Sequence, residues 1–377
     1  MSPRNSSTSS SDKARTRFIL YLVISTLGSL LLLDLLINTL FAYPGDTKVT
    51  NPSRMEMYFE YGRSTDGQLA RMTRRDPSKT APITLAGWYD PIVAEEPREP
   101  PNVPIITIYG MSHAVQLAHA LGRVTHAYKA RAVGAPGATA NWAYGAYLRD
   151  RGGHKSTAVV LALMSANLPM ITTMTPMTWN IGFPMPYTAD RFYAQGDQLQ
   201  VVHPPYNSFD GYTQAFQDPV KWAAACATFA MNDTMYDTFI RSASFLDHSS
   251  LVRLIRRAYG QRLARNAGRG VLDQSGFNPE SEQVKVARAI VINFARQARS
   301  DGMIPVIYLV NNFGYSNYLY QALEPALAQD KIPFVSSDRV ASPSDPRAYL
   351  PNSHFVDSVD DRLAQTLISV VEMARQK

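Results

Sequence analysis

The chain has little charge of either sign and almost no cysteine. Only 18% of its 377 residues are charged, and the single cysteine excludes a disulfide within the chain and a cysteine-rich metal site. That residue, Cys226, lies in an alanine-rich run and is expected to be small, apolar and buried. The net charge of +6 includes no block of lysine or arginine, and zinc-finger and helix-turn-helix spacings are absent, so nucleic-acid binding is not expected. The following histidines lack the spacing of metal ligands, so neither a metal nor another cofactor is expected: His119, His126, His154, His203 and His248.

One long apolar run lies near the N-terminus. Residues 18–43 are almost wholly apolar, and about 20 such residues suffice to cross a bilayer as a helix. The run is longer than the apolar part of a cleaved secretory signal, so we interpret it as an uncleaved membrane anchor. Basic residues precede it: Arg4, Lys13, Arg15 and Arg17. This bias predicts a cytoplasmic tail at 1–17 and an external location for the chain after the anchor. Asp34 interrupts the run and marks either a helix–helix contact or a tolerated polar residue near its outer end.

The rest of the chain is predicted to consist of a neck at 44–103 and one domain at 104–377. The neck holds a candidate helix at 54–74 and ends in the proline-rich linker 97–104. Strands and helices then alternate, which predicts a parallel sheet covered by helices. The strands are expected at 105–109, 130–133, 158–164, 303–310 and 334–335, and the helices at 114–128, 140–149, 280–300, 317–329 and 359–375.

An insertion at about 168–278 interrupts this alternation. It contains a predicted hairpin at 192–202, with a turn at Gly196-Asp197. It also contains a basic amphipathic helix at 249–266. That helix either contacts a membrane surface or an acidic polymer, or presents its arginines to water, and we favour the solvated face.

Four short segments carry residues of chemical interest. Ser112 follows the first strand in "IYGMSHA", Gly137 follows the second in "VGAPGATAN", Asn167 follows the third in "MSANLP", and His354 precedes the last helix in "LPNSHF". A lone serine after a strand is otherwise most often a helix cap. In this order, however, the four residues resemble the SGNH (GDSL-type) hydrolase superfamily over 103–170 and 280–377.

The resemblance implies an α/β three-layer sandwich and acyl transfer through a serine. Ser112 would attack an ester carbonyl, and His354 would take the proton from its hydroxyl. The oxyanion hole would consist of the backbone N–H groups of Ser112 and Gly137 and the side-chain amide of Asn167.

The chain departs from the superfamily pattern at two places. The usual Gly-Asp-Ser is Gly110-Met111-Ser112 here, and the aspartate expected two or three residues before the histidine is replaced by Asn352 or Pro351. Three interpretations stay open: a weak triad in which Asn352 orients His354, a Ser–His dyad, and a catalytically damaged descendant. Asp357 is a nearby reserve, and His113 is expected to point away from the site.

Membrane-anchored members of this superfamily include alginate-type exopolysaccharide O-acetyltransferases and proteins that accompany bacterial cellulose synthesis. The resemblance thus implies a periplasmic domain on a bacterial inner membrane, with a polysaccharide, an acyl donor and an exopolysaccharide synthesis complex as partners. Trp142, Trp179 and Tyr187 are expected either to stack on sugar rings or to pack in the core. Two alternatives remain: a lipid-directed esterase or thioesterase with an apolar tunnel at Ser112, and a non-catalytic polysaccharide-binding scaffold in which His354 points away.

Overall fold

The computed structural model describes residues 9–45, 50–73, 87–97, 103–153, 155–180 and 185–376. The chain divides into two compact units, Met1–Ala81 with Ser242–Tyr259, and Pro82–Arg241 with Gly260–Lys377. This division differs from the predicted boundaries, because part of the predicted insertion belongs to the same unit as the anchor. Most of the predicted linker 97–104 lies outside the described residues.

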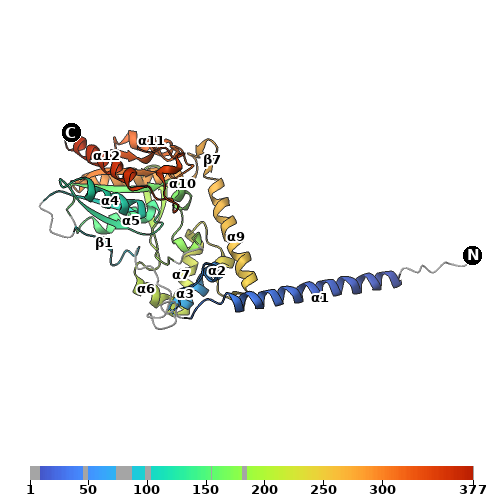
Figure 1. Cartoon of the computed structure of the whole chain (residues 1–377). Helices are drawn as coiled ribbons and strands as arrows, with labels where there is room; N and C mark the ends of the chain where they lie inside the picture. Colours follow the sequence, from blue (N-terminus) through green and yellow to red (C-terminus); the bar gives the residue numbers. More distant parts are fainter. Residues whose placement is uncertain are drawn as a thin grey trace, which may run out of the picture. The chain divides into compact units, whose positions relative to one another are not determined.

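The first unit begins with the long helix α1, Ser9–Leu40 (Figure 1). Its segment Lys13–Leu40 is long and apolar enough to cross a membrane. The helix ends three residues before the predicted end of the anchor, and the chain then reaches Pro44, whose ring disfavours a helical conformation in the preceding residue.

Two short helices replace the single helix predicted at 54–74. Helix α2, Arg54–Glu60, starts with a capping box between Ser53 and Glu56, and helix α3 is Thr65–Thr73. Gly62 lies in the break between them, where an added Cβ would come within 2.2 Å of the backbone oxygen of Arg253. The break therefore depends on a backbone approach from a distant segment, which helical spacing alone does not reveal.

The second unit is built on a six-stranded sheet with the order β1-β3-β2-β4-β9-β10. The strands are β1 (Ala94–Glu95), β2 (Ile105–Gly110), β3 (Lys129–Gly134), β4 (Ala158–Met164), β9 (Ile304–Val310) and β10 (Phe334–Ser336). Only β1 pairs antiparallel, so the sheet is mostly parallel, as predicted. The central strands are apolar on both faces and almost completely buried, which is typical of a parallel sheet between helices.

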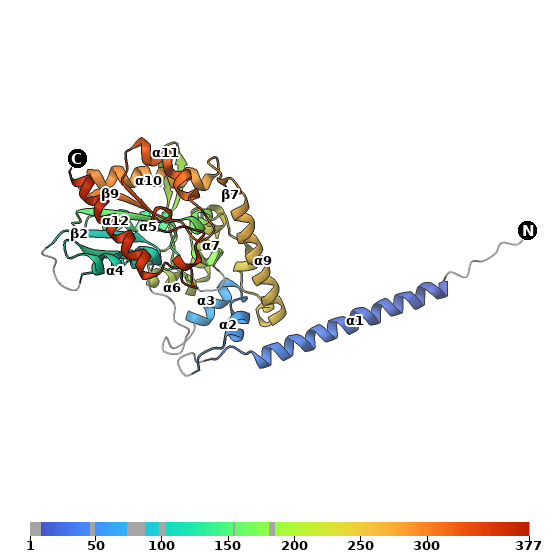
Figure 2. The ribbon, with the colours of Figure 1, turned by 45° about the horizontal axis from the view of Figure 1, so that its top comes forward.

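Helices cover both faces of this sheet. They are α4 (Ser112–Val124), α5 (Ala140–Asp150), α10 (Glu282–Ser300), α11 (Tyr318–Gln329) and α12 (Asp357–Arg375). Helix α4 packs on β2, β3 and α12, whereas α10 packs on α5, α11 and β9. Figures 1 and 2 show α4 beside α12. Because crossovers between parallel strands are right-handed, the reversal after β3 carries α5 to the face opposite α4.

The insertion adds elements to both units, because 242–259 belongs to the first unit. The predicted hairpin is present as β5 (Arg191–Gln195) and β6 (Gln198–Val202), and it packs on α10. A cluster of aromatic side chains, including Trp88, Tyr206 and Tyr212, forms a core of its own beside α7 (Pro219–Asn232). Cys226 in α7 is only half-buried, so the expectation of a fully buried thiol is wrong. The remaining elements are η1 (Ser165–Met170), η2 (Pro176–Thr178), α6 (Phe209–Gln217), α7 (Pro219–Asn232), α8 (Thr238–Arg241), η3 (Phe245–His248), α9 (Ser250–Arg269), β7 (Leu272–Asp273), β8 (Gly276–Phe277), η4 (Ser337–Arg339) and η5 (Pro346–Ala348).

Candidate active site

Ser112 lies at a point of the sheet where the connections from two neighbouring strands run to opposite faces. The chain leaves β2 towards α4 on one face, whereas the neighbouring strand β3 leads to α5 on the other face. Such a switch point leaves a crevice at the carboxyl ends of the strands, where open α/β sheets bind their ligands. The N-cap of α4 is Met111, and Ser112 is the first helical residue. Its hydroxyl is therefore not the helix cap, which leaves it available for other contacts.

The imidazole of His354 contacts that hydroxyl. Nε2 of His354 lies 2.7 Å from Oγ of Ser112, although 242 positions separate the two residues. The loop before α12 holds the histidine: the backbone N–H of Leu350 donates to the carbonyl of His354 at 2.7 Å, and Tyr349 forms a β-bridge with Phe355. The loop thus brings a serine hydroxyl and an imidazole within hydrogen-bond distance, which is the geometry that an activated nucleophile needs.

Burial favours the neutral form of His354. The side chain is half-buried, and desolvation lowers its pKa below the ordinary value of 6.5. A neutral imidazole at neutral pH has a lone pair that can accept the hydroxyl proton of Ser112.

His113 lies against His354, so the expectation that it points away from the site is wrong. The two imidazole centroids are 5.0 Å apart, and the ring of Phe355 lies equally close to His113 on another side. Burial lowers the pKa of His113 to about 3, and the nearby His354 contributes to the shift. His113 is therefore neutral and packs against the candidate base. No sequence signal beyond its adjacency to Ser112 pointed to this role.

Among the described residues, no third side chain bonds the ring of the candidate base. Nδ1 of His354 is buried and has no hydrogen-bond partner among the described residues. The side-chain oxygen of Asn352 instead accepts a hydrogen bond from the backbone N–H of His354 at 3.3 Å. Asp357, the predicted reserve, is exposed and lies 3.6 Å from a guanidinium nitrogen of Arg123. Of the three interpretations left open by the sequence, this geometry argues against the weak triad, because Asn352 bonds the backbone and not the imidazole of His354.

Gly137 and Asn167 lie together in the loops that follow β3 and β4. Gly137 has a φ of +64°, a left-handed conformation that glycine adopts readily. The side-chain nitrogen of Asn167 donates to the carbonyls of Gly137 and Ala138, both at 3.1 Å. Asn167 therefore orders the Gly137 loop in this state, and it would donate to an oxyanion only after exchanging one of these bonds. Within the described residues, the backbone N–H groups of Ser112 and Gly137 have no acceptor.

Of the three aromatic residues expected either to stack on sugar rings or to pack in the core, two are buried. Trp142 is 2% exposed, and its indole N–H donates to the carbonyl of Gly87 at 2.7 Å. Tyr187 is also buried, with its hydroxyl donating to the carbonyl of Pro136 at 2.8 Å. Both belong to the core, so they cannot stack on a substrate. Trp179 is half-buried, and its ring would contact a Cβ at Gly137 at 3.4 Å, which puts it beside the candidate oxyanion loop.

Two cavities lie elsewhere in the second unit. A cavity of about 620 Å³ is lined by Met303, Phe334 and Met373, and one of about 670 Å³ by Ala118 and His119. Ser112 and His354 line neither of them.

Comparison with protein-family models finds no match, and a search of curated proteins finds no relative. The geometry around Ser112 is therefore the basis for assigning a function.

Proposed function

We propose that this chain is an SGNH-type serine esterase or O-acyltransferase whose second unit forms the superfamily's three-layer sandwich. One observation carries the proposal: Oγ of Ser112 lies 2.7 Å from Nε2 of His354, at the carboxyl edge of a mostly parallel sheet. The neutral state that burial favours for His354 supports its role as the base.

The reaction proceeds in two steps. Oγ of Ser112 attacks the ester carbonyl while His354 takes its proton, and the tetrahedral oxygen accepts hydrogen bonds from the N–H groups of Ser112 and Gly137. The C–O bond to the leaving alcohol then breaks, and His354 returns the proton to that alcohol. In the second step an acceptor hydroxyl, from water or from a sugar, attacks the acyl-enzyme. His354 takes and returns one proton again, and Ser112 is regenerated.

The open Nδ1 of His354 predicts a slow enzyme. An aspartate at this place fixes the imidazole tautomer and stabilises the imidazolium, and replacing it with asparagine in a serine protease lowers the rate about 10⁴-fold. Here the described residues supply no partner for Nδ1. We therefore expect basal hydrolysis well below that of complete triads.

The proposed substrate is an acetylated exopolysaccharide or its acyl donor. Trp179 remains as an aromatic residue beside Gly137 on which a sugar ring could stack. In this proposal α1 anchors the chain in a bacterial inner membrane and the tail is cytoplasmic. The rest of the first unit and the whole second unit are periplasmic, within an exopolysaccharide synthesis complex.

A catalytically silent scaffold is the second candidate, and the unpartnered Nδ1 of His354 is the observation that favours it. A scaffold does not need a histidine aimed at a serine, however, and the 2.7 Å contact favours the enzyme.

The test uses the full chain in detergent with a fluorophosphonate probe and a chromogenic acetyl ester. The wild type and the Ser344→Ala control, which changes an exposed serine of the same unit, should both be labelled and should both release acetate. Ser112→Ala should lose both activities. Transfer, rather than hydrolysis alone, is detected as acetate on an added polysaccharide acceptor.

Two outcomes contradict the proposal. Equal labelling of wild type and Ser112→Ala would show that Ser112 is not the nucleophile. An unlabelled, inactive but folded wild type would support the scaffold instead.

A further inference from the structure

The N-terminal part of α9 buries two of its arginines and exposes two large apolar side chains. Arg256 is 2% exposed and Arg253 is also buried, whereas Ile255 is 61% exposed and Tyr259 is exposed as well. The preferred prediction of a solvated basic face is therefore wrong for Arg253 and Arg256. In a surface helix of a soluble protein, the apolar side chains face the core and the charged side chains face water.

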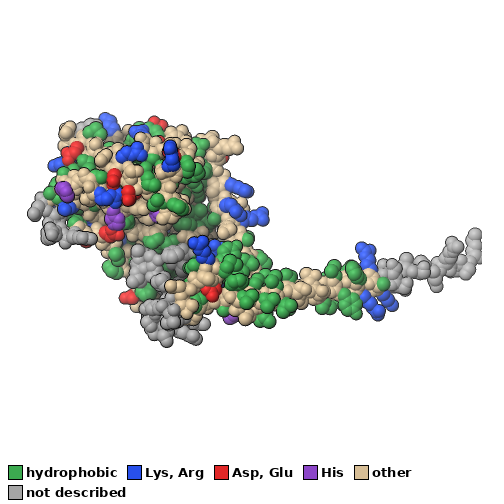
Figure 3. All heavy atoms as spheres, viewed as in Figure 1, with side chains coloured by type: hydrophobic (Ala, Val, Ile, Leu, Met, Phe, Trp, Pro, Cys, Tyr) green, Lys and Arg blue, Asp and Glu red, His purple; other side chains and the backbone are tan. Residues whose placement is uncertain are grey.

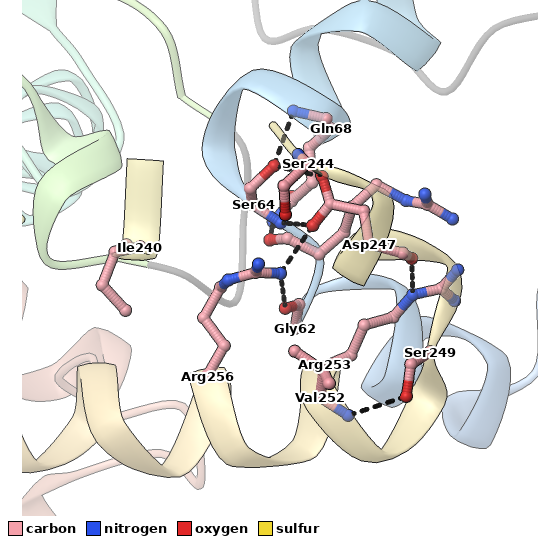
Figure 4. Close-up of polar contacts among 12 residues, drawn as sticks. Gly62, Ser64, Gln68, Ile240, Ser244, Asp247, Ser249, Val252, Arg253 and Arg256 are labelled. Carbon is pink, nitrogen blue, oxygen red and sulfur yellow. Dashed lines mark hydrogen bonds and ion pairs between the residues drawn. The ribbon is translucent and has the colours of Figure 1, made fainter. Parts of the chain in front are cut away.

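Polar contacts within the first unit hold the two buried arginines (Figure 4). Nη1 of Arg256 lies 2.6 Å from the carboxylate of Asp247 and also donates to the carbonyl of Gly62. Arg253 donates to the carbonyl of Asp247 at 2.7 Å and lies 3.7 Å from the carboxylate of Glu60. The arginines are thus structural, and they turn the opposite side of α9 outwards.

Asp247 is the centre of this cluster. Its carboxylate accepts hydrogen bonds from both the backbone N–H and the hydroxyl of Ser64. Burial alone would raise the pKa of Asp247, but the bonds from Ser64 and the charge of Arg256 lower it overall. The ionised carboxylate therefore bonds the segment between α2 and α3 to the start of α9. These buried contacts determine which side of α9 faces outwards.

The end of α1 caps the start of α9. The carboxylate of Asp34 accepts hydrogen bonds from the backbone N–H of Leu251 at 2.9 Å and from the hydroxyl of Ser249 at 3.1 Å. One turn further along α1, Asn38 accepts from the hydroxyl of Ser250 at 2.7 Å. A carboxylate beside the first N–H groups of a helix is favoured by the helix dipole. Asp34 is therefore a helix–helix contact, which was one of the two interpretations of this residue.

These contacts fix the depth of α9 relative to the apolar helix. If Arg17 marks the inner surface, a hydrocarbon layer of about 30 Å, or about 20 residues at 1.5 Å each, ends near Asn38. Asp34 then lies about 6 Å inside that boundary. The start of α9, bonded to both residues, must reach the level of the lipid headgroups or slightly deeper.

Large apolar side chains are exposed at this level, beside the exposed imidazole of His248. Phe245, in the 3₁₀ turn directly before α9, is 82% exposed, and Ile255, in the second turn of α9, is exposed as well. Met55, Tyr58 and Tyr259 are exposed in the same unit. Figure 3 shows hydrophobic side chains gathered where α1 ends, and basic side chains at its other end. Exposed tyrosines are typical of the boundary between lipid and water.

We propose that Phe245 and Ile255 insert into the outer-leaflet interface of the same membrane that α1 crosses. The first unit then has two membrane contacts, a spanning helix and an interfacial surface. Lipid covers the apolar side chains that α9 exposes. This inference rests on the proposed membrane location of α1. It does not depend on any catalytic activity of Ser112.

The test measures the surroundings of single spin labels on the full chain in phospholipid nanodiscs. The background is Cys226→Ser, which removes the only native thiol, and its circular dichroism melting curve should match that of the wild type. Labels at Phe245→Cys and Ile255→Cys are compared with Leu27→Cys in α1 and with Val220→Cys, an equally exposed apolar site of the second unit. Oxygen partitions into lipid, whereas a nickel chelate stays in water.

The labels at 245 and 255 should have an oxygen-to-nickel accessibility ratio near that at 27 and well above that at 220. Water-like ratios at 245 and 255, with a lipid-like ratio at 27, would overturn the inference while α1 still spans. A water-like ratio at 27 would overturn the spanning premise itself. Neither result would bear on labelling of Ser112 by the fluorophosphonate, so the two proposals fail separately.

Discussion

Replacing His113 with phenylalanine should make the stability of the second unit less sensitive to acid. The His113 imidazole is buried against His354 and Phe355, and its pKa falls from 6.5 to about 3 on folding. Between these two values the unfolded chain binds a proton that the folded chain does not. Stability therefore rises with pH in this window, is fully present above about pH 6.5, and is lost as the pH falls below it.

The size of the effect follows from the two pKa values. Each pH unit below 6.5 removes about 1.4 kcal/mol of unfolding free energy as long as the folded pKa stays lower still. Between pH 7 and pH 5 the loss is about 2 kcal/mol. This figure depends little on the folded pKa, provided that it lies well below pH 5. Asp360 and Asp233 give the unfolding free energy a pH dependence of the opposite sign. Burial raises the pKa of these carboxyls to about 7 and about 6, so the folded chain holds protons that the unfolded chain releases.

Urea unfolding of the full chain in detergent measures this difference. All four tryptophans lie in the second unit, so their fluorescence reports on that unit alone. The unfolding free energy of wild type should fall about 2 kcal/mol further than that of His113→Phe between pH 7 and pH 5, and the carboxyl contributions cancel in this comparison. The control His126→Phe removes an exposed imidazole and should keep the wild-type dependence. Equal pH dependence in wild type and His113→Phe would refute the reasoning.

Four further outcomes follow from the same geometry. Asn352→Asp should change the esterase rate roughly fivefold at most, or about 1 kcal/mol of barrier, because the side chain at 352 bonds the backbone N–H of His354. A hundredfold rise would show that the new carboxylate bonds Nδ1 of His354 instead. The rate should reach half its maximum below pH 6.5, because burial lowers the pKa of His354, and a midpoint above that value would contradict the assignment of the base. Gly137→Ala should lower the urea midpoint, since the left-handed backbone costs about 1–2 kcal/mol with a Cβ, and an unchanged midpoint would argue against that conformation. Asp34→Ala should weaken hydrogen-exchange protection in the first turn of α9 by about 0.5–2 kcal/mol, and unchanged protection would mean that the cap is dispensable.

Strands and helices with a clear hydrophobic period were predictable from the sequence. The strands β2, β4 and β9 start within a residue of their expected positions, since a buried parallel strand is a short apolar run between turns. Helix α4 starts two residues before its expected beginning, because Met111 is the N-cap and Ser112 is already helical. The break between α2 and α3 was not predictable, since it depends on the approach of Arg253 to Gly62 across 191 positions.

The candidate site was predictable in its motifs but not in its surroundings. Ser112 and His354 follow from short motifs at the ends of elements, and these ends meet at one edge of the sheet. Whether Trp142 faces solvent depends on the carbonyl of Gly87, and the neighbours of His113 depend on how the loop before α12 folds. Such contacts join distant segments, and no local pattern encodes them.

The first unit consists of two separate segments of the chain, so no single truncation removes it. The chain passes from the first unit to the second after Ala81, returns at Ser242, and leaves again after Tyr259. Deleting the residues before Pro82 would therefore remove only one part of the first unit. The remaining part would keep Arg253 and Arg256 but lose Glu60 and the carbonyl of Gly62. A fragment made by trimming the N-terminus would thus keep 242–259 without the residues that it packs against, and removing the whole first unit requires excising 242–259 as well.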